Sequence, residues 1–125
     1  MDMNLWFLAA GATSFAITLL HLFGGGPTVA APLLAAKELD AVVKYLNYYC
    51  WHLVSIGLAL MAAAFAWSGL VEAAWEVAVL GTVAALAYCV WGLVLVVIKQ
   101  QRFRDMPQGW LFLPVAGLGL LGMIV

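Results

Sequence analysis

The sequence predicts an all-α fold, an integral membrane four-helix bundle, from its composition and from the grouping of its apolar residues. Hydrophobic residues make up 67% of the 125 residues and charged residues only 9%. A soluble domain is typically about half apolar and about a quarter charged. A fold of this size cannot bury so much apolar surface, because small domains leave much of their surface exposed. Lipid is therefore the expected solvent for most of the chain.

The apolar residues fall into four stretches of membrane-spanning length. A hydrocarbon core of roughly 30 Å is crossed by about 20 apolar residues in a helix. The predicted spans are residues 5–23, 45–67, 73–98 and 109–125. The third has excess length that allows it to tilt, and the fourth is the shortest.

The first connection begins with three glycines and a proline, Gly24 to Pro27. Glycine commonly ends a helix in a left-handed conformation, and proline cannot continue one. We therefore expect the first helix to stop here, and segment 27–39 to be a short interfacial helix or a shallow re-entrant segment, since it is too short to span. Glycines so close to His21 would also let a ligand or another helix approach the backbone.

The basic residues predict the orientation. All five lie in the first and third connections: Lys37, Lys44, Lys99, Arg102 and Arg104. By the positive-inside rule these loops are cytoplasmic and both termini lie on the non-cytoplasmic side. The net charge of −1 provides no basic field, so we expect no nucleic-acid partner.

Small residues indicate where the helices touch, because helix association in lipid depends on close packing. The predicted contact surfaces are Gly57 with Ala62 and Ala63 in the second span, Ala78, Gly81, Ala85 and Gly92 in the third, and Gly117, Gly119 and Gly122 in the fourth.

Polar side chains inside the spans are few, and they follow helical spacing. Ser14, Thr18 and His21 share one face of the first span, and Tyr48, His52 and Ser55 share one face of the second. Both histidines fall in the half of the spans that is predicted to be cytoplasmic.

This polar face has three interpretations. The histidines could join helices through hydrogen bonds to hydroxyls and carbonyls. His21 and His52 could instead ligate a b-type haem from facing helices. Alternatively, a cavity could bind a lipid, a quinone or another hydrophobic molecule. Its predicted lining is Thr18, Tyr48, His52, Ser55, Tyr88 and Trp91.

Other site chemistry is not favoured. Cys50 and His52 are two residues apart and point to different sides of a helix, so we expect no metal centre there. No acidic residue lies near the middle of a span, which argues against an exporter built on a central carboxylate.

A resemblance rests on three short motifs: His21 at the end of the first span, "PLL" at residues 32–34, and "CWH" at residues 50–52. With these motifs the first half of the chain resembles small four-helix bacterial membrane proteins of uncharacterised function. The resemblance implies a bacterial inner-membrane location and no particular activity.

The sequence thus predicts a multi-pass membrane protein that acts as a binding or accessory component rather than an enzyme. Its expected partners are membrane lipid and either other membrane-protein subunits or further copies of itself. A haem-containing redox protein and a small oligomeric transporter are the alternatives.

Overall fold

The computed structural model describes residues 3–125, and its fold is all-α, as the composition predicts. The helical elements are α1 (Leu5–Leu19), η1 (Leu20–Ala30), α2 (Ala31–Ala35), α3 (Ala41–Leu70), η2 (Glu72–Ala74), α4 (Trp75–Ile98) and α5 (Gln108–Ile124). α1, η1 and α2 are consecutive, so residues 3–125 form four main helical segments. Three of these are long and apolar enough to span a membrane, Leu5–Ala35, Ala41–Leu70 and Glu72–Ile98, whereas Gln108–Ile124 is a shorter apolar helix.

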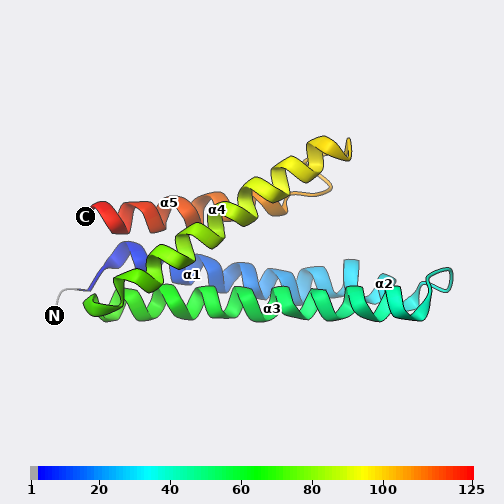
Figure 1. Cartoon of the computed structure of the whole chain (residues 1–125), viewed down its shortest axis with the longest axis horizontal. Helices are drawn as coiled ribbons and strands as arrows, with labels where there is room; N and C mark the ends of the chain where they lie inside the picture. Colours follow the sequence, from blue (N-terminus) through cyan, green and yellow to red (C-terminus); the bar gives the residue numbers. More distant parts are fainter. Residues whose placement is uncertain (1–2) are drawn as a thin grey trace.

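The helices run alternately up and down, so the molecule has two distinct ends (Figure 1). The start of α1 and the end of α5 lie together at one end, which we call the terminal end. The α2–α3 and α4–α5 connections lie at the other, the loop end. α1 packs mainly along α3, and α4 mainly along α5, while α1 also contacts α5. α4 leaves α3 as it runs toward the loop end (Figure 1).

Asn4 fastens three helices together at the terminal end. Its Oδ1 accepts hydrogen bonds from the amides of Trp6 and Phe7, both at 3.1 Å, and so caps α1. Its Nδ2 donates to the carbonyl of Gly122 in α5 at 2.8 Å. Its backbone amide donates to the carbonyl of Gly69 in α3 at 3.0 Å. The side chain and the backbone amide of Asn4 therefore fix the positions of α1, α3 and α5 relative to one another along the bundle.

Part of the packed core lies in this half of the molecule, where aromatic rings fill space that glycines leave open. The rings of Phe7 and Phe65 lie 6.4 Å apart, and both side chains are buried. A Cβ on Gly122 would collide with Phe7, and one on Gly81 would lie 3.2 Å from Phe65. The predicted small-residue surfaces are largely buried here, except that Ala63 is exposed and Gly117 faces open space.

The expected helix stop at Gly24–Gly26 is wrong. The helix continues through these residues as the π-helical segment η1 and then as α2, up to Ala35. No glycine among residues 3–125 has a positive φ, so no left-handed cap forms. In an α-helix the ring of Pro27 would clash with the carbonyl four residues earlier. The wider π turn pairs residues five apart, which is how the chain accommodates proline without ending the helix.

A hydroxyl side chain also stabilises this segment. Thr28 Oγ1 donates to the carbonyl of Gly24 at 2.9 Å. α2 continues directly from η1 and lies beside the start of α3 (Figure 1). The residues after the glycines therefore belong to the same helical segment as α1.

Candidate functional site

Two of the polar residues of the first two spans, His21 and Ser55, meet where η1 lies against α3. His21, the second residue of η1, stacks on the indole of Trp51, with ring centroids 3.9 Å apart and an interplanar angle of 21°. Its Nε2 lies 3.0 Å from Ser55 Oγ and 3.3 Å from the Trp51 carbonyl. Ser55 Oγ itself donates to that carbonyl at 3.2 Å. We call these three residues the histidine cluster.

His21 Nε2 has a hydrogen-bond partner in either tautomer. When Nε2 carries the hydrogen it donates to the Trp51 carbonyl, which can only accept, and when Nδ1 carries it Nε2 accepts from the Ser55 hydroxyl. The His21 Nε2 is thereby used within the protein.

Gly25 explains how the indole fits against η1. A Cβ on Gly25 would lie 2.6 Å from Cη2 of Trp51, whereas a Cβ on Gly26 would meet nothing within 4 Å. The middle glycine of the three therefore lets another helix approach the backbone of η1, one of the two uses expected from the sequence. Trp51 itself was missed as a site residue. Its position beside His52 in the "CWH" motif was the available signal.

His52 lies apart from this cluster. Its ring packs edge-on against Tyr48 of the same helix, with centroids 4.7 Å apart, and its side chain is exposed. A haem ligated by His21 Nε2 and His52 would have to displace the contacts of His21 with Trp51 and Ser55. In this structure the His21 Nε2 is therefore already engaged with α3.

The other predicted lining residues lie on α1 and α4. Thr18 is buried and its Oγ1 donates to the Ser14 carbonyl at 2.8 Å within the same helix. Tyr88 of α4 packs edge-on against Phe112 of α5, with centroids 5.1 Å apart. Trp91 is 62% exposed. The structure brings Ser55 to His21 and Tyr48 to His52. It places the Tyr88 ring against α5 and its hydroxyl beside Gly57 of α3, where a Cβ would lie 3.3 Å from it.

The polar groups of this region are satisfied internally. Among residues 3–125, every buried side-chain nitrogen or oxygen has a hydrogen-bond partner. Within the same residues, no three His, Cys, Asp or Glu side chains come together as a metal site would need. The histidine cluster can therefore tie η1 to α3, and the exposed side of α3 that carries His52 is left for other contacts.

No protein-family model, curated protein or solved structure matches this chain.

Proposed function

We propose that this chain is a four-helix bundle in the bacterial inner membrane, with both termini on the non-cytoplasmic side, and that it acts as a non-catalytic accessory subunit. All five basic residues belong to the loop end, where the α2–α3 and α4–α5 connections lie (Figure 1). The terminal end carries none. Such a bias favours a cytoplasmic loop end.

The main observation behind this proposal is the length of α3. Its 30 residues extend about 45 Å at 1.5 Å per residue. A hydrocarbon core of about 30 Å would contain all of it only at a tilt of roughly 48°, whereas helices tilt by up to about 40°. Trp67 and Trp75 are exposed at the terminal end and suit the interface there. For an untilted helix, about the first ten residues of α3 would extend past the opposite boundary. Figure 1 shows that this end reaches farther than the α4–α5 connection.

The extended part of α3 is apolar and aromatic on its exposed surface. Val42, Leu46 and Tyr49 are 73%, 57% and 59% exposed. Contiguous apolar surface outside the hydrocarbon core marks an interaction site. His52 is exposed one turn farther along, and ionisable residues within a span mark functional positions. The occupant that fits this surface is a helix of another membrane-protein subunit, which would cover apolar side chains and offer His52 a polar partner.

Photocrosslinking in the intact bacterial membrane tests this proposal. A photoreactive amino acid replaces Tyr49 in the full chain, and the matched control replaces Val83 of α4, which is equally exposed at 57%. We expect position 49 to join one partner protein of defined mass, position 83 to join none, and His52→Ala to lower the yield. Adducts with lipid alone, or of twice the mass of this chain, would contradict an accessory subunit.

The proposed orientation has its own test. Alkaline phosphatase, which is active outside the cytoplasm, and green fluorescent protein, which fluoresces inside it, are fused in turn to each end of the chain. Both ends should give phosphatase activity and no fluorescence. Opposite results at the two ends would overturn the four-span arrangement.

An absorption spectrum of the purified protein tests the haem alternative. Because His21 Nε2 bonds Ser55 and Trp51, we expect no Soret band after expression with excess haem precursor. A Soret band that disappears in His52→Ala would replace the accessory role with a redox role.

A further inference from the structure

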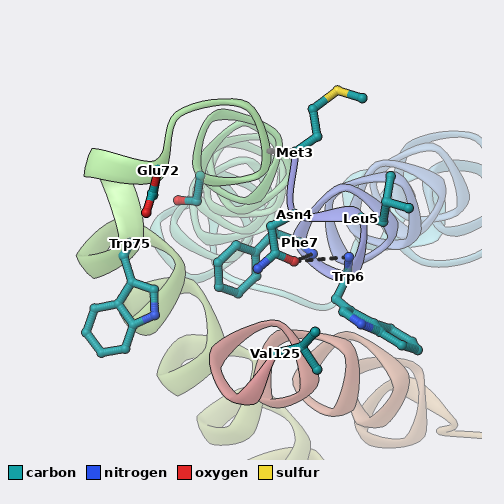
Figure 2. Close-up of a pocket in the computed structure, with 9 residues that line it drawn as sticks. Met3, Asn4, Leu5, Trp6, Phe7, Glu72, Trp75 and Val125 are labelled. Carbon is teal, nitrogen blue, oxygen red and sulfur yellow. Dashed lines mark hydrogen bonds between the residues drawn. The ribbon is translucent and has the colours of Figure 1, made fainter. Parts of the chain in front are cut away.

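A second site lies at the terminal end, opposite the histidine cluster. A cavity of about 380 Å³ opens there between the start of α1, the end of α3, the η2–α4 junction and the end of α5 (Figure 2). This volume falls within the roughly 300–1,000 Å³ typical of small-molecule sites.

Two indoles stand on either side of the cavity. Figure 2 shows Trp6 of α1 and Trp75 of α4 on opposite sides of Asn4 and Phe7. Their side chains are 41% and 48% exposed, so their rings are accessible to a ligand. The face of an aromatic ring carries negative charge, and the tryptophan ring attracts cations most strongly.

Glu72 gives the cavity its charge. It is the one charged side chain among the described residues that line the cavity, and Figure 2 shows it on the same side as Trp75. The neutral polar groups nearby are already engaged. Asn4 bonds two amides and the Gly122 carbonyl, and the Ser68 hydroxyl donates to the Ala74 carbonyl at 2.7 Å. Because Asn4 also occupies the first amides of α1, that helix start has little left to offer an anion.

We propose that this cavity binds an organic ammonium group, with the Glu72 carboxylate as counter-charge and the indoles of Trp6 and Trp75 against its hydrocarbon substituents. A carboxylate with two indoles suits a cation that carries apolar groups. An inorganic cation prefers oxygen ligands, and an anion would be repelled by Glu72. The ammonium could belong to the ethanolamine head of a phospholipid or to a soluble quaternary amine, and these two sources are separated below.

Titration of the purified full chain with tetramethylammonium chloride tests the ammonium site. Tryptophan fluorescence is recorded in detergent at constant ionic strength, with sodium chloride as the reference salt. We expect a saturable change in wild type and binding about tenfold weaker in Glu72→Gln, because a cation–π and carboxylate site loses its charge partner. The matched control is Glu76→Gln, an exposed carboxylate that does not line the cavity.

A second variant with its own control tests the contribution of the indoles. Trp75→Leu should also weaken tetramethylammonium binding, while Trp67→Leu should leave it unchanged, because Trp67 is exposed at the same end but does not line the cavity. Far-UV circular dichroism confirms that each variant is folded. Equal affinities for Glu72→Gln and Glu76→Gln, or no saturable change in wild type, would overturn the site.

Lipid nanodiscs distinguish the two sources. If phosphatidylethanolamine is the natural occupant, nanodiscs that contain it should weaken tetramethylammonium binding relative to phosphatidylglycerol nanodiscs, and Glu72→Gln should remove the difference. Equal binding in both nanodiscs would support a soluble quaternary amine as the occupant of the same site.

Discussion

The chain forms two antiparallel helix pairs, and near the loop end the helices of the two pairs contact each other in different ways. In the α4–α5 pair, backbone meets backbone: a Cβ on Gly92 would lie 2.7 Å from the Cα of Gly109. In the α1–α3 pair, large side chains fill the contact, with His21 stacked on Trp51. At this contact Gly25 faces a ring edge rather than another backbone, whereas farther toward the terminal end Gly11 meets the backbone of α3.

The difference shows that close approach and aromatic filling are alternative ways to join helices without a hydrophobic driving force. Small residues gain van der Waals contact by bringing backbones together. The His21–Trp51 stack gains ring contact and hydrogen bonds across a wider separation. The aromatic contact depends on η1, because this segment carries both His21 and Gly25 on the side of Trp51.

Gly109→Ala should produce the largest effect. Its new methyl group would lie 2.8 Å from the Leu93 amide nitrogen and 3.0 Å from the Cys89 carbonyl oxygen, both backbone atoms that cannot rotate away. We expect the free energy of unfolding to fall by about 3 kcal/mol, the upper range for overpacking. The measurement is titration of the detergent-solubilised protein with dodecyl sulfate, followed by circular dichroism.

Gly117→Ala is the matched control in the same helix, because a Cβ there meets nothing within 4 Å. Alanine is the better helix former, by about 1 kcal/mol. This variant should therefore be as stable as wild type or more stable. If both substitutions destabilise equally, the backbone contact of α4 with α5 is not what holds that pair.

Gly25→Ala should have the next largest effect, about 2 kcal/mol of destabilisation from overpacking against Trp51. The methyl group meets the edge of an indole, which can shift only by disturbing its stack on His21. The same unfolding titration measures it. Gly26→Ala, with open space around its Cβ, should be neutral or stabilising, and a loss in both variants would point to a general intolerance of η1 instead.

His21→Phe should cost about 1 kcal/mol, in the range measured for interhelical hydrogen bonds in membrane proteins. The ring stack on Trp51 is retained, and Ser55 keeps its bond to the Trp51 carbonyl, so no buried group loses its partner. A double-mutant cycle with Ser55→Ala isolates the shared hydrogen bond. Strict additivity of the two substitutions would show that the bond contributes nothing.

Tyr88→Leu should have the smallest effect, about 0.5–1 kcal/mol, because it removes an edge-to-face contact with Phe112 on the α4–α5 side. Trp91→Leu changes an exposed ring on the same helix and should leave the unfolding midpoint unchanged. A larger loss for Trp91→Leu would mean that its ring, rather than that of Tyr88, supports the pair.

Composition and apolar stretch length were sufficient to predict an all-α chain with four long helices. Each predicted span overlaps one long helical segment of the structure. The small-residue surfaces were also largely predictable, since Ala78, Gly81 and Ala85 are buried. Gly117 and Ala63 differ because helical spacing alone does not say which side of a helix has a neighbour.

The continuation of the first helix could not be predicted, because glycines followed by proline are a local stop signal and the competing influence is tertiary. The Trp51 indole needs Gly25 as a contact surface, and η1 supplies it without a left-handed turn. The candidate site was predicted in part. The spacing of Ser14, Thr18 and His21 identified the correct face, but not that Thr18 would bond within its own helix. Asn4 was also overlooked, although asparagine before an apolar run is a typical helix cap.

The hydrogen-bond pairing of η1 limits which deletions this segment can tolerate. In this segment each amide pairs with the carbonyl five residues earlier rather than four. Removal of one residue between Leu20 and Ala30 would favour ordinary α-helical pairing, in which the ring of Pro27 would clash with the carbonyl four residues earlier. The length of this segment is therefore expected to be more strictly limited than the chemistry of most of its side chains.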